Sequence, residues 1–141
     1  MSKIRILITD DHAMFRQGVR TLLAAEPDLE IAGEARDAAE AVSLSRQSRP
    51  DVVLMDIGMT GMSSFEATRV IRKERPETRV VFLSMYDDDE YLAECVSIGA
   101  SGYILKESPA EQLLTAIREV DRKSTRLNSS HVSLSRMPSS A

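Results

Sequence analysis

The segment Asp51-Val-Val-Leu-Met-Asp56-Ile-Gly-Met-Thr-Gly-Met-Ser63 contains a short apolar run that ends in an acid. Residues 52–55 include no polar side chain, which is typical of a strand buried on both faces. Asp56 therefore stands at the end of a buried strand, and a glycine-containing loop follows it. In open parallel α/β sheets, ligands bind at this end of the strands. A lone aspartate at this position can instead have a purely structural role, in which it hydrogen-bonds the backbone of its own loop. The residues at the ends of the other strands distinguish this role from ligand binding.

Strand-like and helix-like patterns alternate along the rest of the chain. Four further segments have the composition of strands, namely 4–8, 29–35, 80–83 and 103–105. The segment 29–35 alternates apolar and polar residues, which predicts an edge strand with one wet face. Helix starts are marked by the pairs Asp37/Glu40 and Ser63/Glu66 and by Ser108-Pro109. Five strand–helix repeats predict an α/β fold, with a parallel sheet covered by helices on both faces.

Composition narrows the possible classes of protein. A chain of 141 residues accommodates one domain with a short appendage. The net charge of −4 gives no basic footprint for nucleic acid over the whole domain. Cys95 is the single cysteine, so no intramolecular disulfide can form, and this fits a reducing, cytoplasmic setting. No apolar run approaches the length of a membrane span.

The composition changes after residue 122. Residues 124–141 are rich in Ser and Arg, contain no acid and show no apolar period. Such a segment cannot bury enough surface to offset the entropy lost on ordering. We therefore predict one domain at residues 3–122 and a disordered tail at 123–141 that is foreign to it. His131 lies in this tail and is assigned no role.

Polar residues stand at the ends of four predicted strands. They are Asp10 and Asp11 after the first strand, Asp56 after the third, Ser84 after the fourth and Lys106 after the fifth. Because the carboxyl ends of parallel strands share one edge of a sheet, we expect these side chains to converge there. Such a set is hard to explain as an accident of packing.

The residue types in this set suit phosphoryl transfer. Neighbouring carboxylates repel one another, and all-oxygen ligands suit a hard divalent ion such as Mg²⁺. One aspartate can act as a nucleophile and form an acyl phosphate. Lys106 offers a point charge to a phosphoryl oxygen, and Ser84 offers a hydroxyl donor. Little more is needed, because phosphoryl transfer depends mainly on positioning and charge stabilisation.

Four motifs resemble the receiver domain of two-component response regulators. They are Ile8-Thr-Asp-Asp11-His12, Val53-Leu-Met-Asp56-Ile-Gly-Met59, Leu83-Ser84 and Gly102-Tyr-Ile-Leu-Lys106. The stretch Asp10-Asp-His-Ala-Met-Phe-Arg16-Gln-Gly18 is similar to the LuxR-type (NarL/FixJ) subfamily. The resemblance covers residues 3–122. It implies a flavodoxin-like, doubly wound sheet of five strands in the order 2-1-3-4-5.

The resemblance also implies which residues bind the metal and accept the phosphoryl group. Asp56 would be the phosphoacceptor, loaded from the phosphohistidine of a sensor histidine kinase. Mg²⁺ would be bound directly by Asp11, Asp56 and the backbone carbonyl of Gly58, with Asp10 acting through water. His12 follows the acid pair, but the resemblance gives it no such role, and a Mg²⁺ site prefers oxygen.

Further roles concern the phosphoryl oxygens and the response to them. Ser84 and Lys106 would hold the phosphoryl oxygens. Tyr103 would be the aromatic side chain whose rotamer follows Ser84 on phosphorylation, although a tyrosine in a strand is more often only a core residue. Phosphorylation would then change an interaction face formed by the fourth helix, the last strand and the fifth helix, and a homodimer could form.

Full-length relatives of this kind would be transcription regulators with a helix-turn-helix output domain. The tail after residue 122 has no amphipathic helices, so this chain is not expected to bind DNA directly. It would catalyse its own phosphorylation and dephosphorylation without being a turnover enzyme.

The sequence departs from the family pattern after the phosphoacceptor. Thr60 stands where proline is usual, which removes a constraint on φ and should leave the loop more mobile. Gly58 has no side chain to shield a phosphoryl group, which bears on the lifetime of the acyl phosphate. Glu107 replaces the proline that often follows the lysine.

Two other classes remain open. A Mg²⁺-dependent phosphatase with an aspartate nucleophile uses similar groups, but its acids usually form Asp-x-Asp after the first strand, and here Asp10 and Asp11 are adjacent. The sequence also shows no inserted cap segment. A pseudo-receiver that binds partners without phosphate is the third class, and the complete polar set argues against it.

Overall fold

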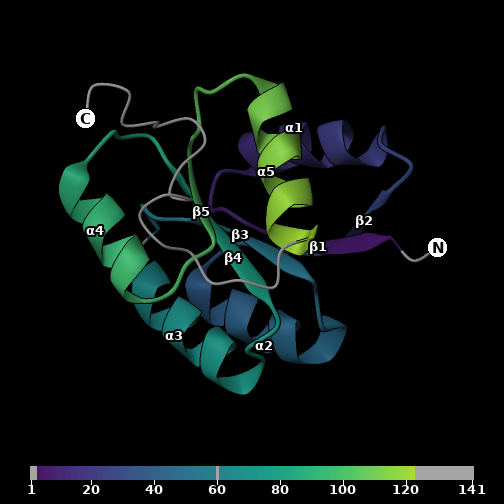
Figure 1. The fold of residues 1–141 in the computed structure, drawn as a ribbon. Helices are drawn as coiled ribbons and strands as arrows, with labels where there is room; N and C mark the ends of the chain where they lie inside the picture. Colours follow the sequence, from purple (N-terminus) through teal and green to yellow (C-terminus); the bar gives the residue numbers. More distant parts are fainter. Residues whose placement is uncertain (1–2, 60, 123–141) are drawn as a thin grey trace.

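Five strands and five helices alternate in the computed structural model, which describes residues 3–59 and 61–122 (Figure 1). They are β1 (Ile4–Thr9), α1 (Ala13–Ala24), β2 (Leu29–Ala35), α2 (Ala38–Ser48), β3 (Val52–Asp56), α3 (Ser64–Glu74), β4 (Arg79–Ser84), α4 (Asp89–Ser97), β5 (Gly102–Leu105) and α5 (Ala110–Arg122). Every strand boundary lies within one residue of the position expected from the sequence.

All neighbouring strands are parallel, in the order β2-β1-β3-β4-β5. The predicted doubly wound α/β fold is therefore confirmed. Helices α1 and α5 cover one face of the sheet, and α2, α3 and α4 cover the other (Figure 1). Strand β2 lies on one side of β1, and β3, β4 and β5 follow in order on the other side. The order of the strands therefore reverses at β1, which pairs directly with the central strand β3.

The central strand β3 explains why residues 52–55 are all apolar. Every residue of β3 is buried. Val53 and Met55 join the core beneath α2, α3 and α4, whereas Val52 and Leu54 join the core beneath α1 and α5. Side chains that alternate along the strand thus each meet a layer of helices, and no position is left for a polar residue before Asp56.

The helix starts follow the signals in the sequence. The Asp37 carboxylate accepts the backbone N–H of Glu40 at 2.8 Å, and the Glu40 carboxylate accepts the N–H of Arg36 at 2.7 Å. The Ser63 hydroxyl accepts the N–H groups of Phe65 and Glu66 at the start of α3. These bonds satisfy backbone donors that have no partner within the helix.

Two local features were not foreseen. The pairing of β1 with β2 shifts between Ile6 and Leu7, so that Ile6 pairs with Ile31 but Leu7 pairs with Gly33. This bulge breaks the simple alternation predicted for the edge strand. Helix α2 also extends to Ser48, one residue further than expected, and ends at Arg49 in the left-handed conformation with φ 49°.

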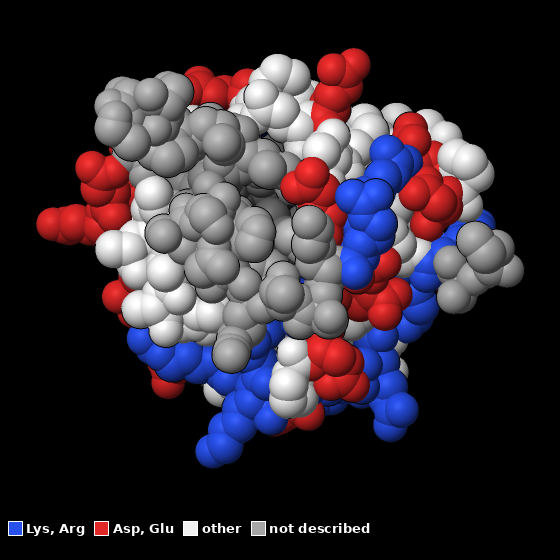
Figure 2. All heavy atoms as spheres, in the orientation of Figure 1, with Lys and Arg blue, Asp and Glu red and all other residues white. Residues whose placement is uncertain are grey.

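Neighbouring helices are joined by ion pairs on the surface. Arg46 of α2 binds Glu74 of α3 at 2.7 Å, and Arg69 of α3 binds Glu94 of α4 at 2.8 Å. Figure 2 shows acidic and basic side chains interspersed around the face it displays. None of the helices in the described ranges has both the length and the apolar character needed to cross a bilayer.

Some expectations fall on residues outside the described ranges. They are the greater mobility of the loop at Thr60 and the disordered tail at 123–141, including His131.

Candidate functional site

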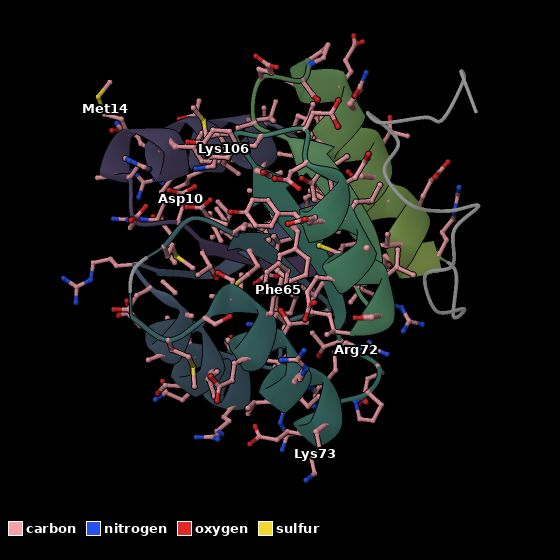
Figure 3. All side chains as sticks on the ribbon, turned by 90° about the vertical axis from the view of Figure 1, so that its left-hand side faces the viewer. Asp10, Met14, Phe65, Arg72, Lys73 and Lys106 are labelled. Carbon is pink, nitrogen blue, oxygen red and sulfur yellow. The ribbon has the colours of Figure 1, made fainter. Side chains whose placement is uncertain are left out.

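Four strand ends bring polar groups to one edge of the sheet. Asp10 directly follows β1, Asp56 is the last residue of β3, Ser84 is the last residue of β4, and Lys106 directly follows β5. Figure 3 shows Asp10 and Lys106 close together beside α1. The polar side chains therefore lie at the carboxyl edge of the sheet, as the sequence predicted.

Lys106 binds two buried carboxylates. Its Nζ lies 2.6 Å from Asp10 Oδ2 and 3.3 Å from Asp56 Oδ1. The side chains of Asp10, Asp56 and Lys106 are 0%, 4% and 7% exposed. The ammonium also lies 4.6 Å from the centre of the Phe15 ring, whose face attracts cations. A single positive charge thus contacts two carboxylates, so the cluster of Asp10, Asp56 and Lys106 keeps a net negative charge.

This imbalance affects the ionisation of Asp56. Burial raises the pKa of the Asp56 carboxyl, and the neighbouring Asp10 charge raises it further. Lys106 and the backbone N–H of Gly58, which donates to Asp56 Oδ1 at 3.3 Å, oppose the rise. An added cation would favour the charged form of Asp56.

The carboxylates lie close enough to share such a cation. Asp10, Asp11, His12 and Asp56 each offer one ligand atom, and these atoms all lie within 4.8 Å of one another. Three of the four are carboxylate oxygens, so the donor set suits a hard divalent ion. The sequence predicted the carboxylates but assigned no part to His12, whose Nδ1 lies 3.1 Å from Asp11 Oδ1 and 3.3 Å from Asp10 Oδ1.

Backbone contacts hold the strand ends in place. The Arg16 guanidinium donates to the carbonyl of Asp10 at 2.6 Å, and the Ser64 hydroxyl donates to the carbonyl of Asp56 at 2.5 Å. The sequence analysis missed both residues. Arg16 appeared there only within the stretch similar to the LuxR-type subfamily, and Ser64 was not assigned a role. The spacing between each residue and its aspartate carries no signal that names the contact.

Ser84 and Tyr103 meet at a third residue. The Ser84 hydroxyl donates to the carbonyl of Tyr86 at 2.9 Å, and the Tyr103 hydroxyl donates to the same carbonyl at 2.7 Å. The N–H of Tyr86 in turn donates to the Ser84 hydroxyl at 2.9 Å. Tyr103 is fully buried, and this burial raises its pKa. Ser84 is therefore linked to Tyr103 through Tyr86, and in this state its hydroxyl is bonded to the loop.

Comparison with known proteins identifies the family. The model of the response regulator receiver domain matches residues 6–118. The chain belongs to this family. It is 43% identical over 119 residues to the transcriptional regulatory protein DegU of Brevibacillus brevis, covering 84% of this chain and 50% of DegU. It is 40% identical over 126 residues to the transcriptional regulatory protein LiaR of Bacillus subtilis, covering 89% and 60% of the two chains.

Solved structures agree with this assignment. A LuxR-family two-component response regulator from Aurantimonas sp. SI85-9A1 matches with a TM-score of 0.81 and 36% identity, covering 86% of each chain. The receiver domain of the putative response regulator NarL from Mycobacterium tuberculosis matches with a TM-score of 0.82 and 31% identity, covering 86% of this chain and 98% of that domain.

The comparisons confirm the predicted LuxR-type receiver domain of two-component signalling. The chain spans about half the length of the curated relatives it matches, and their names describe transcription regulators. The family is one of signalling receivers rather than of metabolic enzymes. This weighs against the phosphatase considered above.

Proposed function

We propose that Asp56 accepts a phosphoryl group from the phosphohistidine of a sensor histidine kinase. The observation that carries this proposal is the position of Asp56, a buried carboxylate at the carboxyl end of the central strand, beside Asp10 and Lys106. This position suits a nucleophile, because a positive group lies beside it and little water surrounds it.

The proposed step exchanges one bond to phosphorus for another. An Oδ atom of Asp56 attacks phosphorus, and the bond from phosphorus to the imidazole nitrogen of the donor breaks with its electron pair on that nitrogen. The product is an acyl phosphate on Asp56. Lys106, already 3.3 Å from Asp56 Oδ1, provides positive charge for a phosphoryl oxygen, and Ser84 provides a hydroxyl donor for another.

The same residues fit Mg²⁺. Asp11 and Asp56 would bind it directly together with the Gly58 carbonyl, and Asp10 would act through water. The mutual proximity of the carboxylates and the excess of negative charge in the cluster support this assignment. When bound, Mg²⁺ would neutralise charge on the carboxylates and on the incoming phosphoryl group.

The shared carbonyl of Tyr86 supports a route from the phosphoryl group to the surface. A Ser84 hydroxyl that turns toward a phosphoryl oxygen gives up its bond to Tyr86, and Tyr103 bonds that same carbonyl. The side chain of Tyr103 would then adjust, changing the face made by α4, β5 and α5. The kinase and a second copy of the chain are the proposed partners of the receiver.

Further features are proposed for the whole protein. The receiver would occupy residues 3–122, and the natural protein would be a cytoplasmic transcription regulator with an output domain beyond it. A Cβ placed on Gly58 would meet no atom within 4 Å. Gly58 therefore places no side chain that could shield a phosphoryl group on Asp56, and this supports a short lifetime of the acyl phosphate.

Intact-mass measurement after incubation with acetyl phosphate tests the proposal. We expect one added phosphoryl group in the presence of Mg²⁺, little without it, and none in Asp56→Asn. Asp89→Asn makes the same chemical change at an exposed position in the first turn of α4 and should leave the addition intact.

Two outcomes would contradict the proposal. If the folded, Mg²⁺-bound chain acquires no phosphoryl group, the pseudo-receiver is favoured. If it releases phosphate steadily from a phosphomonoester without accumulating the adduct, the phosphatase is favoured.

A further inference from the structure

His12 occupies the cap position of α1 but does not cap that helix with its side chain. Its backbone is extended, with φ −98° and ψ 109°, and its N–H donates to Asp10 Oδ1 at 2.8 Å. The imidazole instead turns toward the two acids that precede it. Nδ1 lies 3.1 Å from Asp11 Oδ1 and 3.3 Å from Asp10 Oδ1. The imidazole ring therefore lies directly beside the carboxylates of Asp10 and Asp11.

These separations are those expected of ligands around one ion. An octahedral ion with ligands at about 2.1 Å separates adjacent ligand atoms by about 3.0 Å. Four ligands at the same distance around a tetrahedral ion such as Zn²⁺ all lie about 3.4 Å apart. The two nitrogen–oxygen distances, 3.1 and 3.3 Å, lie within this range. The whole set of four lies within 4.8 Å, so its ligand atoms must move closer together to bind one tetrahedral ion. Small side-chain movements would let all four residues contact the same ion.

The nitrogen changes which ions the cluster favours. Mg²⁺ takes oxygen ligands and retains water, so it gains little from an imidazole. Divalent ions from the later part of the first transition row bind imidazole well, and their affinities for mixed nitrogen and oxygen sites rise toward Cu²⁺, with Zn²⁺ also strong. A site with three carboxylates and one imidazole therefore serves two classes of ion.

We propose that His12 is a nitrogen ligand through which this site binds divalent transition ions such as Zn²⁺, in competition with Mg²⁺. The proposal rests on the assignment of Asp10, Asp11 and Asp56 as the metal-binding carboxylates of the receiver. Zn²⁺ uses His12 together with these oxygens, whereas Mg²⁺ uses the oxygens and leaves His12 unbound. The identity of the bound ion then depends on which ion is available.

A hydrogen bond between the imidazole and the carboxylates is the simpler explanation of the same distances. The two explanations differ in what removal of the ring does. A hydrogen bond alone leaves Zn²⁺ affinity dependent only on the carboxylates, so His12→Ala would change Zn²⁺ and Mg²⁺ binding alike. A nitrogen ligand makes the loss specific to the transition ion.

Calorimetric titration of the full chain with Zn²⁺ and with Mg²⁺ tests the proposal, using wild type, His12→Ala and His131→Ala. His131 is the other histidine of the chain, so its replacement is the matched control. We expect His12→Ala to lose at least about tenfold in Zn²⁺ affinity, because even the loss of a residue that only supports a ligand costs 10–100-fold. Its Mg²⁺ affinity should stay that of wild type, which also shows that the variant is folded. His131→Ala should bind both ions as wild type does.

Electron paramagnetic resonance of the Cu²⁺-loaded chain gives a direct readout. Coupling to an imidazole nitrogen should be present in wild type and in His131→Ala and absent in His12→Ala. Unchanged Zn²⁺ affinity in His12→Ala, or nitrogen coupling that persists in it, would overturn the proposal. Failure of the proposed phosphorylation is a separate result, seen as no Mg²⁺-dependent phosphoryl addition to Asp56 in the same preparations before any transition ion is added.

Discussion

The carboxylate of Asp56 lies in surroundings that disfavour its negative charge. It is almost wholly buried, and Asp10 lies within the same cluster. Lys106 is the cation that contacts both carboxylates, and it cannot neutralise both. The chain therefore gives up stability at this residue, which is common at functional sites. The same shortage of positive charge is what makes the cluster attractive to a cation.

This cost predicts the effect of Asp56→Asn on the metal-free protein. The pKa of Asp56 is raised in the folded state by burial and by Asp10, so its ionised form opposes folding. The substitution should therefore increase the free energy of unfolding at neutral pH. As the pH falls through the folded-state pKa toward the unfolded value, wild-type Asp56 takes up a proton and the penalty disappears. The advantage of the variant should shrink over that range.

Urea unfolding at several pH values, with EDTA present, measures this advantage. Asp89→Asn is the control, because its carboxylate is exposed and its loss should give no gain at neutral pH. A wild type at least as stable as Asp56→Asn at neutral pH would contradict the expectation, as would an advantage that grows on acidification.

At the scale of helices and strands, local signals in the sequence located all five strands to within one residue. The apolar run at 52–55 predicted β3 because a doubly covered strand leaves no room for polar side chains. Asp37 and Ser63 predicted helix starts because their side chains satisfy backbone N–H groups, as the structure confirms. The bulge opposite Leu7 was missed, since it depends on how two strands pair and not on either strand alone.

In the site, too, some features could be predicted from single segments of sequence and others could not. Polar residues at strand ends could be located because strand order fixes where they go. The contact of Arg16 with the Asp10 carbonyl, that of Ser64 with the Asp56 carbonyl and the turn of His12 toward Asp11 depend on side-chain conformations. No spacing rule gives these contacts.

The N-cap of α2 provides a test at this scale. Asp37→Ala removes the acceptor for the Glu40 N–H and should lower the free energy of unfolding by about 1 kcal/mol. Asp37→Asn keeps a side-chain oxygen at the same place and should cost much less. Urea unfolding curves of the two variants measure the difference. Equal losses in both would show that the charge, and not the cap hydrogen bond, is what stabilises the start of α2.

The whole molecule is organised as two cores on either side of one sheet. Cys95 of α4 belongs to the core beneath α2, α3 and α4 and is fully buried. Burial also raises the pKa of its thiol, which keeps the reactive thiolate scarce.

Cys95 can therefore report on the integrity of the whole fold. We expect iodoacetamide to leave it unmodified in the native chain and to modify it fully in concentrated urea, as followed by intact mass. Because Cys95 is the single cysteine, each added group identifies this site. Native labelling as fast as labelling in urea would mean that α4 separates from the sheet without global unfolding.

Borohydride reduction tests the assignment of Asp56 most directly. The reagent converts an acyl phosphate on aspartate to homoserine, which marks the phosphorylated position permanently. After treatment with acetyl phosphate and Mg²⁺, peptide mass analysis should find homoserine at position 56 and aspartate retained at positions 10 and 11. Homoserine at another aspartate, with position 56 unchanged, would contradict the assignment of Asp56 as phosphoacceptor.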